Sequence, residues 1–305
     1  MARPDNFFEV LAGVPVHYDR LAPPFGYGTR GKPAKFYCLD PFETELDECF
    51  QELWDICPLG QAEVIASAGA WVEKPGFHGQ GRAFDIDGIF WAGKGFVTLH
   101  DGFQGGDRVF YYAVEAIVRR HFGTVLDYNY DIDHRDHLHL DDGTAIGFQP
   151  GSPSRVKFLQ GALTHVYELP VKVDGAFGPQ TEQAVATTLG TLGIAGGIDN
   201  VSVWKEFLIR TAEKGFGIAT GPVAEKNPLE LLHDVYAAID RTLTDTGLRK
   251  QVEGTLNAFA NHDETQAWLI EDSPEPRSTS QSLHSREDLA PGYQMWIAMP
   301  WERHQ

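Results

Sequence analysis

The stretch His78-Gly-Gln-Gly-Arg-Ala-Phe-Asp85-Ile-Asp87 carries the strongest structural signal in the chain. Two glycines follow the imidazole, so the backbone can turn sharply there. The residues from Phe84 to Asp87 then alternate apolar and acidic side chains, as a strand does, which places both carboxylates on one face. We therefore expect a turn followed by a strand to carry His78 and Asp85, which are seven positions apart.

A second stretch, His134-Arg-Asp-His-Leu-His-Leu-Asp141, alternates polar and apolar residues from Asp136 and His137 onward. In a strand, His137 and His139 would point to one side. Two such strands side by side would bring His78, Asp85 and one of these histidines together. A catalytic zinc ion takes three protein ligands, with His nitrogen and carboxylate oxygen at about 2.0 to 2.2 Å, and keeps a fourth position for water. The sequence therefore predicts a zinc site, whereas the alternative is a polar strand and a loop histidine without a metal.

The two stretches together resemble the M15-type D-Ala-D-Ala metallopeptidases and, more closely, their extensin-like C-terminal relatives. The similarity runs from about Val64 to Asp142. It implies that Zn²⁺ is the cofactor and that its ligands are His78, Asp85 and His139.

The same resemblance assigns catalytic roles to two further residues. It implies that Asp136, three residues before the last ligand, is the general base, and that His137 stabilises the transition state. For Asp136 to reach the metal, the chain must turn or bulge at Arg135 to Asp136. Many relatives carry a Ser and a substrate-binding Arg upstream, where this chain has SAGAWVEKPG (67–76). Arg82 is the nearest candidate cation for substrate, and pairing with a structural carboxylate is its alternative role.

The chain changes character after Pro150-Gly-Ser-Pro153, which we interpret as a linker. Segments VKFLQGAL (156–163) and VDGAFGPQTEQAVATTLG (173–190) resemble the peptidoglycan-binding type 1 domain, a small three-helix unit. Its expected core comprises Leu159, Leu163, Phe177 and Val185. This motif identifies a fold and only suggests peptidoglycan as the ligand.

We expect an α+β fold in the first part of the chain. Residues 1–150 should form a zinc peptidase domain in which a small antiparallel sheet carries the ligands, with a helix over 40–57, a strand over 64–67 and a helix over 110–120 closed by Gly123. Residues 154–218 should form the all-α wall-binding domain. Residues 219–305 should form a helical region and a partly disordered tail of unknown role.

Composition excludes several classes of partner. The net charge is -18, with 43 acidic against 25 basic residues, which argues against nucleic acid because Lys and Arg supply most phosphate affinity. No apolar run is long enough to span a membrane, and the start does not resemble a signal peptide. The cysteines Cys38, Cys49 and Cys57 permit at most one internal disulfide, and buried reduced thiols are an equal alternative.

The residues and the resemblance predict a zinc-dependent peptidoglycan peptidase, either a carboxypeptidase or an endopeptidase, that hydrolyses stem or cross-link peptides. The alternatives are a non-catalytic peptidoglycan-binding or adaptor protein and a metallo-amidase. Without a visible signal peptide, we expect synthesis in the cytoplasm and action in the periplasm or cell wall after lysis or injection, as a lytic enzyme or antibacterial effector. A secretion-system or immunity protein is the corresponding candidate partner.

Overall fold

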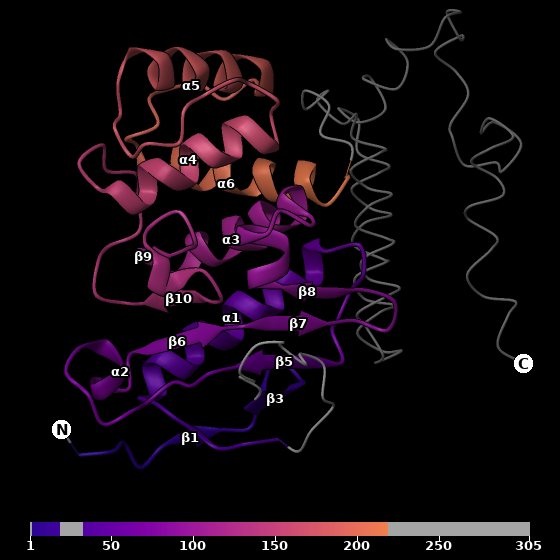
Figure 1. Ribbon diagram of the computed structural model, residues 1–305, viewed down its shortest axis with the longest axis vertical. Helices are drawn as coiled ribbons and strands as arrows, with labels where there is room; N and C mark the ends of the chain where they lie inside the picture. The colour runs from indigo at the N-terminus through magenta and orange to yellow at the C-terminus, as the bar shows by residue number, and fades with distance from the viewer. Residues whose placement is uncertain (1, 19–32, 219–305) are drawn as a thin grey trace, which may run out of the picture. The chain divides into compact units, whose positions relative to one another are not determined.

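The computed structural model describes residues 2–18 and 33–218 (Figure 1). These residues all lie within one compact unit, Met1–Val223. The region expected to be helical with a disordered tail, 219–305, lies outside the described residues. The mixture of small sheets and helices is consistent with the expected α+β class.

Three small sheets form the β part of the described chain. The sheet that carries the candidate ligands is antiparallel, in the order β6-β10-β9, and the largest sheet has the order β2-β3-β5-β7-β8. Strands β1 and β4 pair separately. The bounds are β1 Phe7–Phe8, β2 Val10–Leu11, β3 Val14–Tyr18, β4 Phe36–Tyr37, β5 Val64–Ser67, β6 Ala83–Ile86, β7 Gly88–Phe90, β8 Gly95–Val97, β9 Thr124–Leu126 and β10 Leu138–Asp141.

One pair of strands in the largest sheet is parallel, which the antiparallel expectation did not include. Strand β3 pairs with β5 in parallel, with Val16 opposite Ile65. Parallel neighbours need a long crossover connection, usually a helix. Helix α1 (Asp40–Ile56) lies between the two strands in the sequence and supplies it.

The helices follow the apolar spacing of the sequence. They are α1, α2 (Phe77–Gln80), α3 (Arg108–His121), α4 (Pro153–His165), α5 (Pro179–Leu192) and α6 (Val201–Gly215), with a π-helical turn η1 (Leu99–Phe103) and a 3-10 turn η2 (Ile132–His134). Helix α3 begins where the Asp107 carboxylate accepts a hydrogen bond from the amide of Phe110 at 3.1 Å. The strand expected over 64–67 and the helix expected over 40–57 are confirmed to within one residue.

Gly123 does not close α3 in the way that we expected. The helix ends at His121, and Phe122 is already extended. Gly123 is absent from the glycines with positive φ, so it makes no left-handed cap. A Cβ at this position would instead overlap the backbone carbonyls of Thr144 and Ala145. The glycine is required because two backbone segments approach closely, and the expected capping role is wrong.

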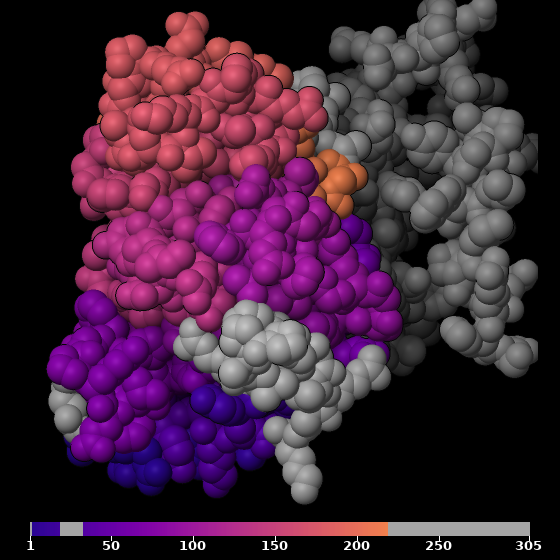
Figure 2. Space-filling view, viewed as in Figure 1, coloured from indigo at the N-terminus to yellow at the C-terminus, as the bar shows by residue number. Residues whose placement is uncertain are grey.

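Helices α4 and α6 pack directly on α3, which lies between them and α1, and α5 packs on α4 (Figure 1). Their surface adjoins that of the preceding part of the chain in the space-filling view (Figure 2). Phe158 of α4 contacts Tyr112 of α3, with 5.9 Å between ring centroids. Phe216, just after α6, packs edge-on against Phe110 at 5.1 Å. One hydrophobic core therefore extends through both parts.

A buried arginine, Arg119, joins the two parts. Arg119 of α3 binds Glu115 at 2.8 Å and donates to the hydroxyl of Ser154 in α4 at 3.1 Å. Among the expected core residues of the helical part, Leu159, Leu163 and Val185 are buried, and Phe177 is half-buried against Phe148.

The three cysteines are buried and unpaired, which agrees with the interpretation as reduced thiols. Burial raises the pKa of Cys38 to about 12, so this thiol stays protonated at neutral pH. Within residues 2–18 and 33–218, none of the helices has the length and apolar character needed to cross a membrane.

Candidate metal centre

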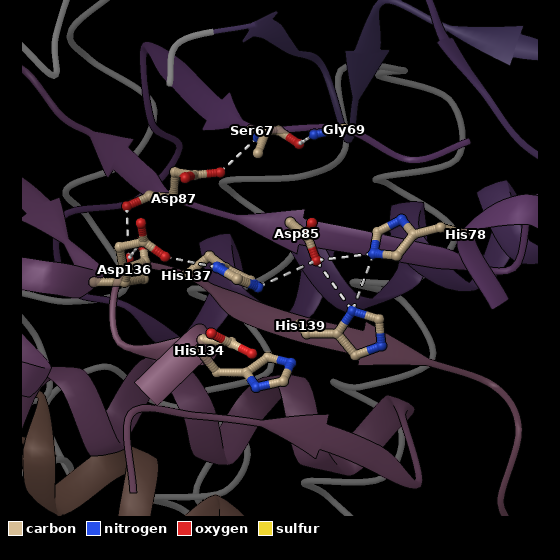
Figure 3. A network of polar contacts seen from close by, with 12 residues as sticks. Ser67, Gly69, His78, Asp85, Asp87, His134, Asp136, His137 and His139 are labelled. Atoms are coloured by element: carbon tan, nitrogen blue, oxygen red, sulfur yellow. Dashed lines mark hydrogen bonds and ion pairs between the residues drawn. The ribbon is translucent and has the colours of Figure 1, made fainter. Parts of the chain in front are cut away.

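His78, Asp85 and His139 converge at the junction of α2, β6 and β10 (Figure 3). The antiparallel register places His139 directly opposite Asp85. His78 Nε2 lies 3.1 Å from Asp85 Oδ1 and 3.1 Å from His139 Nδ1, and the last two atoms are 3.0 Å apart. The three predicted ligand atoms thus form a nearly equilateral triangle.

The triangle has the size that a tetrahedral zinc site requires. Ligand atoms at about 2.0 to 2.2 Å from zinc, at tetrahedral angles, are roughly 3.3 to 3.5 Å apart. The observed separations of 3.0 to 3.1 Å need only a small expansion to reach that range. Two imidazoles and one carboxylate also match the ligand types of catalytic zinc, with a fourth position left for water or substrate.

The orientation of His78 is fixed from behind. Its Nδ1 donates to the carbonyl of Ala70 at 2.5 Å, which leaves the Nε2 lone pair directed at the triangle. Of the two glycines expected to form a turn, Gly81 does so, with φ +69 at the end of α2, whereas Gly79 lies within α2. Gly79 meets a further need, because a Cβ there would overlap the backbone carbonyl of Lys74. The loop that carries Ala70 can therefore pack closely on α2.

His139 is oriented by Asp141, a residue that the sequence analysis did not single out. His139 Nε2 lies 3.1 Å from Asp141 Oδ2, so Nδ1 is presented to the triangle. Asp141 is in turn held by the amide of Gly143 at 2.8 Å. Asp141 follows His139 by two residues on β10 and so shares its face. The same alternation that predicted the ligands would have found it.

The hydrogen bonds within the triangle favour the charged forms of His139 and Asp85. Burial opposes the charged form of His139, but hydrogen bonds with Asp141 and Asp85 outweigh it and raise the pKa of His139 to about 9. For Asp85, burial favours the neutral acid, yet hydrogen bonds from His139 and His78 lower its pKa below the usual range. In the metal-free protein a proton on His139 therefore stands where a cation would bind.

Asp136 and His137 lie in a bend just before β10. The expected turn at Arg135 to Asp136 is confirmed. Asp136 Oδ1 lies 2.9 Å from His137 Nδ1, and His137 Nε2 lies 3.8 Å from Asp85 Oδ1. The His137 ring thus lies between the Asp136 carboxylate and the triangle (Figure 3). His137, rather than Asp136, therefore faces the three ligand atoms.

A fourth imidazole joins this group and was not predicted as a site residue. The ring of His134 lies 5.2 Å from that of His137 and 5.8 Å from that of His139. Its Nδ1 is held by Asp131 Oδ1 at 2.6 Å. Burial lowers the pKa of His134, although Asp131 opposes this shift. The sequence HRDHLH pointed to this placement, but only His137 and His139 of that stretch were assigned to the site.

Arg82 pairs with a carboxylate at the edge of the site. Its Nη2 lies 2.8 Å from Asp142 Oδ1, and the guanidinium lies over the ring of Phe77 at 5.3 Å. Arg82 directly precedes β6 and Asp142 directly follows β10, so the pair lies at the paired ends of these two strands. This contact corresponds to the alternative role given above for Arg82.

A second group of side chains in the described chain also has the spacing to hold a metal: Glu45, Glu48 and His121. Both nitrogens of His121 are already used, since Nδ1 lies 2.9 Å from Glu45 and Nε2 lies 2.6 Å from Glu52. Burial opposes the charge of Glu52, but His121 and Arg120 outweigh it and lower the pKa of Glu52 to about 2. This group acts as an ion-pair network that joins α1 to α3.

Comparison with known proteins gives one relationship. Neither the curated proteins nor the solved structures yielded a match to the chain. Residues 65–149, however, match a family described as "Extensin-like protein C-terminus". The matched segment includes the three candidate ligands together with Asp136 and His137, and it agrees with the extensin-like part of the resemblance stated above. The wider likeness to M15-type peptidases and to peptidoglycan-binding domains stays a prediction.

Proposed function

We propose that this protein is a zinc-dependent peptidoglycan peptidase that hydrolyses stem or cross-link peptides. The observation that carries the proposal is the triangle of His78, Asp85 and His139. In it, each imidazole is oriented by an outer hydrogen-bond partner, as in catalytic zinc sites. The family match over 65–149 supports the proposal because it contains the complete site.

The proposed mechanism assigns a separate task to each residue. His78, Asp85 and His139 would hold zinc, which when bound supplies a Lewis acid that acidifies water and polarises a carbonyl. Asp136 would keep the proton of His137 on Nδ1, so that Nε2 can take a proton from the attacking water. His137 would then deliver this proton to the leaving amine. We accordingly revise the direct base role of Asp136 to one exerted through His137.

The finer domain assignment belongs to the same proposal. We assign peptide hydrolysis to residues 1–150 and peptidoglycan binding to residues 154–218. A wall-binding unit would raise the local concentration of substrate without new catalytic contacts. The net charge of -18 requires that binding to an anionic wall use a shaped site. Delivery by lysis or injection, with a secretion-system or immunity partner, remains the corresponding proposal for location.

Digestion of purified sacculi tests the function. The test compares zinc-loaded native protein, the Asp85→Ala variant and a control, Asp55→Ala, by mass spectrometry of the soluble products. Asp55→Ala removes an exposed carboxylate of α1, outside the proposed wall-binding unit. We expect new peptide ends from the native protein and from the control, and none from Asp85→Ala. Loss of a single terminal residue identifies a carboxypeptidase, and cleaved cross-links identify an endopeptidase.

Two outcomes would contradict the proposal. Stem peptides released intact from the sugar would identify a metallo-amidase. Binding to sacculi without any product, in protein that contains zinc, would identify a non-catalytic wall-binding protein.

A further inference from the structure

Thr98 connects the two parts of the chain that carry the proposed site. It follows β8 and is 1% exposed. Its amide donates to the carbonyl of Asp87 at 3.1 Å. Its hydroxyl Oγ1 lies 3.0 Å from the same carbonyl and 2.5 Å from the carbonyl of Asp136. Asp87 follows Asp85 by two residues, and Asp136 directly precedes His137.

The bend at Asp136 and His137 lies outside the strand ladder. Pairing between β10 and β6 begins at Leu138, opposite Ile86. The Thr98 hydroxyl therefore holds the bend at a point that the ladder does not reach. The Asp136 carbonyl belongs to the peptide group that links it to His137, so the hydrogen bond constrains the plane of that peptide. Through this plane it constrains the direction of the His137 ring.

We propose that Thr98 is a positioning residue for the Asp136–His137 pair. Its hydroxyl holds the bend against the end of β6, so that His137 Nε2 stays directed at the triangle while Asp136 holds Nδ1. The inference rests on the proposed function, because only there does the direction of His137 affect a rate. A purely structural role would stabilise the fold without affecting turnover in the folded protein.

The test uses Thr98→Val, which keeps the shape and removes the hydroxyl, and Thr98→Ser, which restores it. The control is Thr44→Val on the exposed side of α1, since Thr44 Oγ1 also donates to a backbone carbonyl, that of Asp40 at 3.1 Å. We expect Thr98→Val to bind zinc fully and to lose about 10- to 100-fold in kcat with KM little changed. Losses of this size are usual for residues that orient the groups at a metal site without contacting the metal. Thr98→Ser should recover most of the rate, and Thr44→Val should keep the native kcat.

Amide hydrogen exchange provides a readout that does not depend on activity. In Thr98→Val, exchange should accelerate in peptides covering 132–138 and stay unchanged in peptides covering 153–165. If the native protein hydrolyses no peptidoglycan, the proposed function fails, and the exchange result still decides whether Thr98 holds the bend. Native kcat in Thr98→Val, or unchanged exchange over 132–138, would overturn the inference. Should Thr98→Val not fold, Thr98→Ala takes its place with the same expectations.

Discussion

Zinc affinity should rise steeply with pH, because zinc and a proton compete for His139. The hydrogen bonds of His139 with Asp141 and Asp85 raise its pKa to about 9 against the opposing effect of burial. Zinc can bind Nδ1 only after the proton leaves. Below about pH 9, each pH unit therefore changes the apparent affinity by about tenfold for this one proton. Between about pH 6.5 and about pH 8.5 the expected gain is roughly 100-fold.

Competition with a chromophoric chelator at several pH values measures this gain, and calorimetry in buffers of different ionisation enthalpy counts the released proton. Asp141→Asn removes the carboxylate that contacts His139 Nε2, so the pKa of His139 should fall. The rise of zinc affinity with pH should then flatten toward about pH 8.5. The control Asp199→Asn should follow the native curve. An affinity independent of pH, with no proton released, would refute the reasoning.

The same proton links pH to the stability of the metal-free protein. The pKa of His139 in the folded protein is raised above its ordinary value of 6.5. Protonation of His139 therefore contributes fully to the free energy of unfolding below about pH 6.5, and this contribution is lost as pH rises through about 9. Zinc-loaded protein has already lost this proton. The stabilisation by zinc should therefore increase from about pH 6.5 to about pH 9, as the melting temperatures of the two forms would show.

Three further predictions concern other parts of the molecule. Asp136→Asn should retain zinc and lose about 10- to 100-fold in kcat if Asp136 acts through His137, whereas a loss of 10³-fold or more in steady-state assays would restore its direct base role. Burial, together with the charge of Asp127, raises the pKa of Glu115 to about 8. The contribution of protonated Glu115 to the free energy of unfolding is therefore complete below about pH 4.5 and is lost as pH rises through about 8. Glu115→Gln should lose less stability over that range in urea unfolding of zinc-loaded protein. A chain ending at residue 149 should not unfold cooperatively, because it loses the core shared with α4 and α6, and a folded fragment that binds zinc would contradict this.

Much of the metal centre could be predicted because its ligands follow local rules. Strand alternation and one glycine turn grouped His78 and Asp85 with one of two histidines, and the family resemblance then selected His139. The same alternation contained Asp141. The bend at Asp136 was expected because, on a regular strand, a residue three positions before His139 would lie on the opposite face from the metal. The contact of Asp136 with His137 did not follow, because neighbouring side chains on a regular strand point to opposite sides, whereas the observed pair lies in the bend.

Features that depend on distant backbone atoms could not be predicted from sequence. The carbonyl of Ala70 that orients His78 belongs to no recognisable side-chain pattern. Thr98 is 38 residues from Asp136 and meets it only because β8 and the bend lie side by side. The parallel pairing of β3 with β5 was missed because β3 contains Pro15, and a proline within a run argues against a strand. Packing of α4 and α6 on α3 likewise depends on tertiary contacts.

An anomalous-scattering map at the zinc edge, from crystals grown with zinc and without chelator, tests the central claim most directly. We predict one strong peak at about 2.0 to 2.2 Å from each of His78 Nε2, Asp85 Oδ1 and His139 Nδ1. The peak should vanish in His139→Ala. A map with no peak at these three atoms, or with its only peak between Glu45 and His121, would contradict the account.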